Sequence, residues 1–391
     1  MKVFVLLSRV PYPLEKGDKL RAYHQITELA KNHEVCVCCL SEGRENPEAI
    51  AHLRTKVQHV HVIRLSKLLI ALRMLRAIFS DRPFQVHYFL QTAALRNVHR
   101  IITLFQPEHI YCQLTRCSEY VKNLHQYSKT LDYMDAMNAG LRRRAEIAPW
   151  YLRAFIREEA RRMVNYENLI YEYFDHHTII SEQDRQLIYH PNRSRITVVP
   201  NGVDATFFSP NAEAQKNTDL LFTGNMSYPP NVDCAVRLAQ EIMPLIRREM
   251  PGATLTIAGA TPAPAVVALS NEHTTVTGWM EDIRQAYLHA KVFIAPMRIG
   301  SGLQNKLLEA MSMELPCITS SLAAQAMHDD AREALVTSDE PEAIAAQAVR
   351  LLRQPEERAQ RGKAGRNTIL RHFNWQATTQ LLETLWNPTH P

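Results

Sequence analysis

The stretch APMRIGSGLQNKLLEAMSMELPCITS, from Ala295 to Ser320, decides the predicted fold. It continues an apolar run that reads as a strand (Val292–Ala295) and then passes through a glycine-containing loop (Gly300–Gly302). Apolar residues at helical spacing follow and predict a helix over Leu303–Met313, before a second apolar run at Cys317–Thr319. A strand, a loop, a helix and another strand in this order are typical of a parallel α/β sheet.

The loop and helix of this stretch are suited to binding a phosphate. A glycine loop that leads into a helix exposes unpaired backbone N–H groups beside the positive end of the helix dipole. Lys306 and Glu309 lie one turn apart and share a face of the helix. A cation for phosphate and a carboxylate for sugar hydroxyls are the groups that a nucleoside diphosphate requires. An ordinary helix cap beside a solvated Lys–Glu pair is the alternative interpretation.

The alternation of strands and helices extends outward to both halves of the chain. In the N-terminal half, strands are expected at Lys2–Leu7, Val35–Leu40, Val60–Ile63, His109–Cys112, Lys129–Asp132 and His177–Ile180, and helices at Leu20–Ala30, Pro47–Thr55, Ala93–Leu104, Tyr120–His125 and Leu152–Phe174. Pro, Asn and Gly interrupt the pattern over Val198–Asn217, which reads as a linker. We therefore expect two doubly wound domains, 1–208 and 209–372, with an amphipathic helix at 373–391 packing back on the first domain.

Glycines follow four of the strands expected in the second domain. They are Gly224, Gly259, Gly278 and Gly300. Because the carboxyl ends of parallel strands meet at one edge of a sheet, these glycines are expected at a common rim, where such sheets bind ligands. Their position favours a nucleotide cleft, although loops between strands and helices often contain glycine by chance.

Composition limits the class of protein. With 391 residues, 46% of them hydrophobic and 22% charged, the chain is typical of a soluble protein of two or three domains. Its net charge of +5 does not indicate nucleic acid as a partner. The seven cysteines form no C-x-x-C pair and no cluster with metal-ligand spacing, which favours reduced thiols in the cytoplasm and no metal site. Met1–Leu7 reads as a strand rather than a signal peptide, and no run is long enough to span a membrane.

Four segments carry a resemblance to a known family. RIGSGLQNKLLEAM (Arg298–Met311), NGVD (Asn201–Asp204), LLFTGNMSYPPNVD (Leu220–Asp233) and VTGWMEDIRQAY (Val276–Tyr287) resemble family 4 glycosyltransferases of the GT-B fold. The chain most resembles the sugar transferases associated with exopolysaccharide and exosortase gene systems. The resemblance covers nearly the whole chain and is more specific in its C-terminal half. It implies an α/β protein in which two Rossmann-like doubly wound domains, an N-terminal acceptor domain and a C-terminal donor domain, face across a cleft.

The resemblance also implies roles for individual residues. Glu309 matches the second glutamate of the E-x7-E signature, which accepts hydrogen bonds from the ribose of the donor, and Lys306 matches the basic residue facing the diphosphate. Gly302 and Leu303 match the loop whose N–H groups meet the distal phosphate. Gly224 matches the glycine that lets the backbone pass close to the donor.

Further positions follow from the same resemblance. Gly278, Trp279 and Met280 match the loop whose main chain reads the nucleobase. Gly17, in EKGDKLR, lies where the family brings its N-terminal glycine loop to the reaction centre.

Three positions depart from the family pattern. Ser301 occupies the position of the first glutamate of E-x7-E, which puts the choice of donor sugar in doubt. Asn225 replaces the arginine that often follows the first-strand glycine, so Lys306 would hold the diphosphate with less help. Glu314 lies where a glycine usually closes the helix, although a left-handed conformation and the helix dipole both disfavour glutamate there.

The chemistry implied is hexose transfer from a nucleotide-diphosphate sugar, used as a co-substrate, with no metal and no other cofactor. The resemblance implies retention of anomeric configuration, with the leaving phosphate helping to deprotonate the acceptor. Lys306 and Glu309 are the expected catalytic residues of the donor side. In LDYMDAMNAG, Asp135 follows a strand and is a candidate acceptor-binding or basic residue, ahead of Asp132. A strand-end turn with an aspartate cap is the alternative.

Two basic, apolar segments suggest a partner surface. LSKLLIALRMLRAIF (Leu65–Phe79) and LRRRAEIAPWYLRAFIREEARR (Leu141–Arg162) combine arginines with large apolar residues. Such helices bind anionic membranes, which would suit a glycan or lipid-linked glycan acceptor at the inner face of the plasma membrane. A solvated helix packed on the sheet explains the same composition.

Other functions remain compatible with these patterns. A GT-B epimerase or phosphorylase is one, and a catalytically inactive homologue that binds glycans or nucleotides as an assembly module is another. A periplasmic binding protein is also bilobed, but the missing export signal counts against it.

Overall fold

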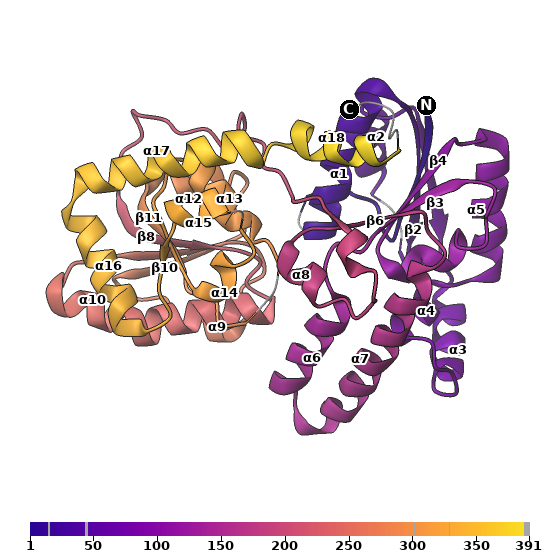
Figure 1. Ribbon diagram of the computed structural model, residues 1–391. Helices are drawn as coiled ribbons and strands as arrows, with labels where there is room; N and C mark the ends of the chain where they lie inside the picture. The colour runs from indigo at the N-terminus through magenta and orange to yellow at the C-terminus, as the bar shows by residue number, and fades with distance from the viewer. Residues whose placement is uncertain (15, 44–45, 300–301, 328, 387–391) are drawn as a thin grey trace. The chain divides into compact units, whose positions relative to one another are not determined.

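The chain folds into two compact units. The computed structural model describes residues 1–14, 16–43, 46–299, 302–327 and 329–386. Unit 1 comprises Met1–Pro200 and the chain from Thr378 onward, and unit 2 comprises Asn201–Ala377 (Figure 1). Unit 2 thus starts earlier than the boundary expected at residue 208. Within unit 2, the Asn201 side chain donates a hydrogen bond to Asn305 Oδ1 at 3.0 Å.

Unit 1 is built on a seven-stranded parallel sheet. The strand order is β3-β2-β1-β4-β5-β6-β7. The strands are β1 (Lys2–Leu7), β2 (Glu34–Ser41), β3 (His59–Arg64), β4 (His109–Gln113), β5 (Ser128–Asp132), β6 (His176–Ile179) and β7 (Thr197–Val198). The helices are α1 (Gly17–Asn32), α2 (Pro47–Arg54), α3 (Lys67–Ala77), α4 (Phe84–Phe89), α5 (Thr92–Phe105), α6 (Met137–Ile147), α7 (Trp150–Tyr171) and α8 (Glu182–Gln186), and α18 (Trp375–Trp386) returns to this unit from Thr378 onward.

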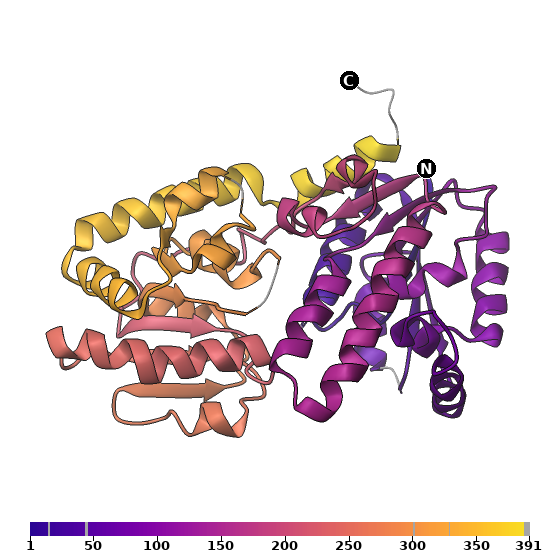
Figure 2. The same cartoon turned by 60° about the horizontal axis from the view of Figure 1, so that its bottom comes forward.

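The sheet of unit 1 is buried on both faces because alternate side chains of each strand point to opposite sides. Phe4 and Leu6 of β1 belong to one apolar core, together with residues of α4, α5 and α7. Val3, Val5 and Leu7 belong to the other core, together with residues of α1, α2 and α18. Helices accordingly cover both faces (Figures 1 and 2). Trp386 fixes the end of α18 by donating a hydrogen bond from Nε1 to Thr130 Oγ1 at 2.9 Å.

Unit 2 repeats the arrangement on a six-stranded parallel sheet of order β10-β9-β8-β11-β12-β13. Its strands are β8 (Thr218–Thr223), β9 (Leu255–Ala258), β10 (Thr274–Gly278), β11 (Ala290–Ala295), β12 (Cys317–Thr319) and β13 (Val336–Thr337). Its helices are α9 (Pro229–Arg237), α10 (Met243–Glu249), α11 (Pro264–Val267), α12 (Arg284–His289), α13 (Asn305–Ser312), α14 (Ser321–Ala324), α15 (Asp329–Ala334), α16 (Pro341–Arg353) and α17 (Pro355–His372). The predicted class, two doubly wound parallel α/β domains, is confirmed.

Two local predictions need correction, whereas Glu314 has the expected conformation. The segment Tyr120–His125 is not an α-helix. A 3-10 helix at Thr115–Tyr120 ends where the α-helix was expected to begin. The basic stretch 141–162 is not one helix, since Pro149 separates α6 from α7. Glu314 adopts the disfavoured left-handed conformation, with φ of 56°. Its carbonyl oxygen would lie 2.1 Å from a Cβ on Gly362, so the glycine of α17 accommodates this turn.

In the described part of the chain, no helix combines the length and the apolar character that crossing a membrane requires.

Candidate functional site

The strand order of unit 2 defines where a ligand would bind. From β8 the chain runs through β9 and β10 to one edge, and from β11 it runs through β12 and β13 to the other. The carboxyl ends of β8 and β11 therefore flank the switch point at which ligands of such sheets bind. The last residues at this end of β8 are Phe222 and Thr223, and Gly224 follows them. Phe222 lies against Lys306, Thr223 is hydrogen-bonded to the tyrosine that holds Glu309, and Gly224 lies beside Asn231.

Lys306, in the first turn of α13, lies above the end of β8. Its ammonium group is 4.7 Å from the centre of the Phe222 ring and 2.5 Å from Asn231 Oδ1, to which it donates a hydrogen bond. The side chain is partly buried. Burial lowers the pKa of Lys306 to about 8, so the group is still mostly protonated at neutral pH. A partly buried cation whose hydrogen-bond partners, Asn231 Oδ1 and Met297 Sδ at 4.0 Å, are both neutral is prepared to receive an anion.

Asn231, in α9, connects this lysine to the glycine loop. Its Nδ2 donates a hydrogen bond to the Asn225 carbonyl at 2.9 Å. A Cβ on Gly224, whose φ is 157°, would lie 2.6 Å from Asn231 Nδ2. Any side chain at position 224 would therefore displace Asn231 from its place between the loop and Lys306.

Glu309 lies one turn further along α13 and is held by a second series of hydrogen bonds. Tyr287 of α12 is fully buried, and its hydroxyl donates to Glu309 Oε2 at 2.7 Å. The same hydroxyl is 2.7 Å from Thr223 Oγ1. Burial raises the pKa of Glu309, and the bond from Tyr287 opposes that rise. These contacts use Oε2, so the orientation of the carboxylate is fixed through one of its oxygens.

The glycines of the rim allow the first two loops to meet. A Cβ on Gly259, with φ of 143°, would lie 1.8 Å from the Gly224 carbonyl oxygen, a distance that no side chain tolerates. The Gly259 N–H in turn donates to the Gly278 carbonyl at 3.1 Å. Gly224, Gly259 and Gly278 thus lie along one rim, whereas Gly300 falls outside the described residues.

Asn225 has a structural role at the position where the family pattern has an arginine. Its Oδ1 accepts hydrogen bonds from the Ser227 backbone N–H at 3.0 Å and the Ser227 hydroxyl at 2.7 Å. It also accepts one from the Thr261 hydroxyl at 3.0 Å. The side chain therefore joins the loops after β8 and β9 and adds no positive charge to the rim.

The loop before α13 is only partly described. Ser301 lies outside the described residues. Gly302 has φ of 77°, a conformation that favours glycine, and its carbonyl accepts a hydrogen bond from Gln304 at 3.3 Å. Leu303 is buried, and the helix begins at Asn305 rather than at Leu303. Lys306 is consequently the second residue of the helix, close to its positive end.

The predicted base-reading loop follows β10. Gly278 has φ of 68°, Met280 is half-buried, and the Trp279 side chain is 71% exposed. An exposed indole beside a glycine turn is available for stacking on a planar ring.

Two predicted site residues belong to unit 1. Gly17 is the exposed first residue of α1, and a Cβ there would meet nothing within 4 Å. Asp135 follows β5 and is exposed. Desolvation by the surrounding protein, followed by the charge of Asp184, raises the pKa of Asp135 to about 7. This carboxylate is thus suited to proton transfer near neutral pH.

Asp132, by contrast, is completely buried in unit 1. It forms an ion pair with Arg21 at 2.7 Å and accepts hydrogen bonds from the Tyr111 hydroxyl at 2.7 Å and the Thr178 hydroxyl at 3.0 Å. The Arg21 guanidinium also donates to the Val199 carbonyl at 2.9 Å. Asp132 is therefore a structural residue, inaccessible to an acceptor.

Sequence reasoning overlooked Thr223, Asn231 and Tyr287 as site residues. All three lie inside the segments that carry the family resemblance. The available signal was a polar group at a position where the neighbouring pattern is apolar, as Thr223 ends the run LLF. Among the described residues, no group of three or more His, Cys, Asp or Glu side chains could hold a metal ion.

Comparisons with known proteins agree with this geometry. Residues 217–354 match the family model described as glycosyl transferases group 1. An uncharacterised 44.6 kDa protein in the cps region of Klebsiella pneumoniae is 22% identical over 357 residues, covering 87% of this chain and 88% of that protein.

Solved structures show the same fold over the whole chain. Sucrose-phosphate synthase from Thermosynechococcus elongatus superposes with a TM-score of 0.72 at 16% identity, covering 99% of both chains. The Anabaena protein HepE in complex with UDP-glucose has a TM-score of 0.67 at 12% identity, covering 98% of this chain and 99% of that one. The chain has the GT-B fold, and the comparisons support a sugar-transferring enzyme.

Proposed function

We propose that this protein is a retaining, metal-independent hexosyltransferase of family 4. It would transfer a sugar from a nucleotide-diphosphate donor to a glycan or lipid-linked glycan acceptor in bacterial surface polysaccharide synthesis. The observation that carries the proposal is the position of Lys306 and Glu309 at the switch point of unit 2, within the segment that matches glycosyl transferases group 1. The relative from a cps region supports the assignment to surface polysaccharide.

Lys306 would stabilise the leaving group. As the bond between the anomeric carbon and the donor phosphate breaks, negative charge grows on the diphosphate and positive charge on the sugar. A cation already fixed by Asn231 stabilises this separation more than it stabilises the ground state. The N–H groups around Gly302 and the start of α13 would add to this effect. Glu309, oriented through Tyr287, would accept hydrogen bonds from the ribose.

Asp135 would act on the acceptor. In a retaining transfer, the acceptor oxygen bonds to the anomeric carbon on the face that the phosphate leaves, and the phosphate takes the acceptor proton. Asp135 would orient the acceptor hydroxyl, and its pKa of about 7 would make this role depend on pH near neutrality. The same carboxylate could instead remove the proton directly as a general base.

Unit 1 also offers a surface for an anionic membrane. Large apolar side chains are exposed on α3, just after it and at the start of α7, including Leu75 (61%), Phe79 (92%) and Trp150 (83%). The two helices are joined, since Arg162 of α7 donates a hydrogen bond to the Ala77 carbonyl at 2.7 Å. Both extend to the same end of unit 1 in each view (Figures 1 and 2). Exposed apolar residues among lysines and arginines favour binding at an anionic interface.

Vesicle sedimentation tests the membrane part of the proposal. The protein should sediment with vesicles containing phosphatidylglycerol and remain in solution with vesicles of phosphatidylcholine alone. The pair of changes Phe79→Asp and Trp150→Asp should abolish binding, whereas Leu104→Asp, at another exposed apolar side chain on α5, should not. Equal binding of both variants would reject this surface.

Donor turnover separates the enzyme from an inactive binding module. The protein would be incubated with UDP-, GDP-, ADP- and CMP-sugars, and release of the nucleotide would be followed with and without a glycan acceptor. An enzyme releases nucleotide from at least one donor, and Lys306→Ala suppresses the release. Binding of a donor without any turnover would instead assign the chain to the catalytically inactive class. Epimerase or phosphorylase activity would be recognised by its product.

A further inference from the structure

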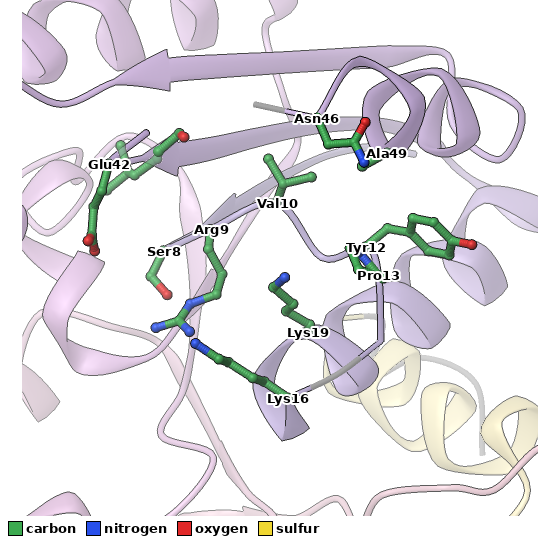
Figure 3. A pocket seen from close by; sticks show the side chains of 12 residues that line it. Ser8, Arg9, Val10, Tyr12, Pro13, Lys16, Lys19, Glu42, Asn46 and Ala49 are labelled. Carbon is green, nitrogen blue, oxygen red and sulfur yellow. The ribbon is translucent and has the colours of Figure 1, made fainter. Parts of the chain in front are cut away.

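A polar pocket of about 380 Å³ in unit 1 does not by itself identify a ligand. It lies at the carboxyl ends of the adjacent strands β1 and β2 (Figure 3). Both signs of charge line it, since Arg9, Lys16 and Glu42 all belong to its wall, and Arg9 is already paired with Asp18 at 3.1 Å. The contacts that bear most directly on the proposed transfer lie instead in unit 2, around the helix that carries Lys306 and Glu309.

The segment 201–208, with which unit 2 begins, holds α13 at both of its ends. At the start of the helix, the Asn201 side chain donates a hydrogen bond to Asn305 Oδ1 at 3.0 Å. At its end, the buried Ser312 hydroxyl donates one to the Phe208 carbonyl at 2.7 Å. Asn305 and Ser312 are the first and last residues of α13, so the whole helix lies between these two contacts.

Arg366 of α17 reinforces the second of these contacts. Its Nη1 donates hydrogen bonds to the Phe208 carbonyl at 3.2 Å and to the Ser312 carbonyl, and its Nη2 donates one to the Ala205 carbonyl at 3.4 Å. The last carbonyls of a helix have no partner within it, and a cation beside them is stabilised by the helix dipole. Arg366 therefore binds the C-terminal end of α13, just before Glu314 replaces the usual glycine, and joins that end to the segment.

The Phe208 side chain extends the connection to the donor carboxylate. Its ring meets the Tyr287 ring edge-on, with the ring centres 6.0 Å apart and the planes at 90°. Tyr287 in turn donates the hydrogen bond that orients Glu309. The segment 201–208 is therefore connected to both donor residues, to Lys306 through the first turn of α13 and to Glu309 through Tyr287.

The same segment is one of the two stretches of chain that lead to unit 1. It follows Pro200, where the first part of unit 1 ends, and the chain re-enters unit 1 at Thr378. The two stretches are paired within unit 2, because the Val203 N–H donates to the Phe373 carbonyl at 2.7 Å and Val203 forms a parallel bridge with Asn374. The helix that would bind the donor is thus attached to the connections between the units.

We propose that Arg366 is a positioning residue for the transfer, because it fixes the segment 201–208 against α13 and thereby sets the positions of Lys306 and Glu309. The inference rests on the proposed transferase function. Binding of a nucleotide-diphosphate sugar and docking of the segment then favour each other, and thermodynamic linkage requires the two effects to be equal in size. A residue that served only the stability of the fold would not make the segment respond to the donor.

Calorimetric titration of the full chain with UDP-glucose, GDP-mannose and ADP-glucose measures the contribution to donor binding. Arg366→Gln should weaken binding of the tightest of these probes about tenfold, since charge-assisted hydrogen bonds to the segment are lost. Arg366→Lys keeps a cation at the end of α13 and should recover part of the loss. Lys363→Gln, at an exposed position of the same helix α17, should bind as the wild type does.

Amide hydrogen exchange separates positioning from stability. The Phe208 N–H donates to the Asp204 carbonyl at 2.8 Å, in a turn that Arg366 and Ser312 hold through the Phe208 carbonyl. The bound probe should slow exchange at Phe208 about tenfold in the wild type and in Lys363→Gln, the same factor by which Arg366→Gln weakens binding. In Arg366→Gln the probe, at saturation, should slow this exchange much less.

Ser312→Ala is a second variant in case Arg366→Gln does not fold. It removes one hydrogen bond to the Phe208 carbonyl and leaves Arg366 in place, so donor binding should weaken about threefold. Wild-type affinity in Arg366→Gln, or in Ser312→Ala where only that variant folds, would overturn the positioning role and leave the donor site intact, as would exchange at Phe208 that the probe does not change. Binding of none of the three probes to the wild type would refute the transferase and this inference with it.

Discussion

Two pairs of opposite charges, one in each unit, occupy the carboxyl edge of a parallel sheet and differ in how completely they are satisfied. In unit 1, Arg21 and Asp132 are both fully buried, and the Asp132 carboxylate also accepts hydrogen bonds from Tyr111 and Thr178. In unit 2, Lys306 and Glu309 are only partly buried, and neutral side chains hold them. Asn231 accepts a hydrogen bond from Lys306, and Tyr287 donates one to Glu309.

The difference separates a structural pair from a site. Burial alone would lower the pKa of Arg21, but the charges and hydrogen bonds of Asp132 and Tyr111 together outweigh burial and raise it. For Lys306 burial prevails and lowers the pKa to about 8. The first cation has its counter-ion within the protein, whereas no carboxylate of the described residues forms an ion pair with the second. A diphosphate would supply that counter-ion.

Removing one partner of the buried pair should have the largest effect. Asp132→Ala leaves the Arg21 cation buried and unpaired, and we expect the free energy of unfolding to fall by about 3–5 kcal/mol. Urea denaturation followed by circular dichroism measures this loss. The double variant Arg21→Met with Asp132→Leu should recover most of it, and a single variant as stable as the wild type would contradict the structural role.

Lys306→Met should lower activity strongly and leave the free energy of unfolding nearly unchanged, the opposite of Asp132→Ala. Transfer should fall by about 10²–10³-fold, as for other removed stabilisers of transition-state charge, while the free energy of unfolding stays within about 1 kcal/mol of the wild type. Steady-state kinetics and urea denaturation are measured on the same samples, with Lys363→Met as the matched control. A loss of stability as large as that of Asp132→Ala would make Lys306 structural as well.

The pH dependence of the same site should follow from its lysine. In the free enzyme, kcat/KM should decline as pH rises through about 8, because Lys306 loses its proton there. Lys306→Arg keeps its charge and should remove this decline, even if its activity is lower. A decline that persists unchanged in Lys306→Arg would assign it to another group.

Tyr287→Phe tests the support of Glu309 and should have an intermediate effect. Without the tyrosine hydroxyl, Glu309 Oε2 and Thr223 lose their common partner, and donor affinity should fall about tenfold. Titration calorimetry with the donor measures the loss, and Tyr151→Phe, an exposed tyrosine on α7, serves as the control. Unchanged affinity would show that the carboxylate needs no orientation.

The smallest expected effect concerns Asp135. Its pKa is raised from 3.8 to about 7, so between these values the folded protein holds a proton that the unfolded chain has released. Stability attributable to this group therefore falls as pH rises through that window, and the cost is complete above pH 7. At pH 8 the free energy of unfolding of Asp135→Asn should be about 1 kcal/mol higher than that of the wild type. The gain is modest because the side chain is exposed. The difference should vanish below pH 4.

Much of the fold could be predicted from the sequence because buried parallel strands are continuous apolar runs. β1 and β12 have the predicted bounds, and the glycines at positions 224, 259 and 278 lie along the predicted rim. The sequence pattern did not predict features that depend on contacts between residues far apart in the chain. Asn201 belongs to unit 2, where its side chain bonds to Asn305 far along the chain, and β7 and β13 are two-residue strands that no periodicity can indicate.

The site was predictable only in part for the same reason. Lys306 and Glu309 share a helical face, so their spacing in sequence reveals them. Tyr287 and Asn231 reach them from α12 and α9, and only the folded sheet brings these helices to one edge. Nothing in the sequence distinguishes the buried Asp132 from the exposed Asp135 three residues later, because the end of β5 decides which one points inward.

Donor binding by the wild type, Lys306→Met and Lys363→Met tests the central claim most directly. The melting temperature of each protein would be measured with a panel of UDP-, GDP-, ADP- and CMP-sugars, since a ligand bound to the native state raises it. We predict that at least one nucleotide sugar stabilises the wild type and Lys363→Met, and fails to stabilise Lys306→Met. Stabilisation of all three proteins to the same extent, or of none by any donor, would contradict a donor site at Lys306 and Glu309.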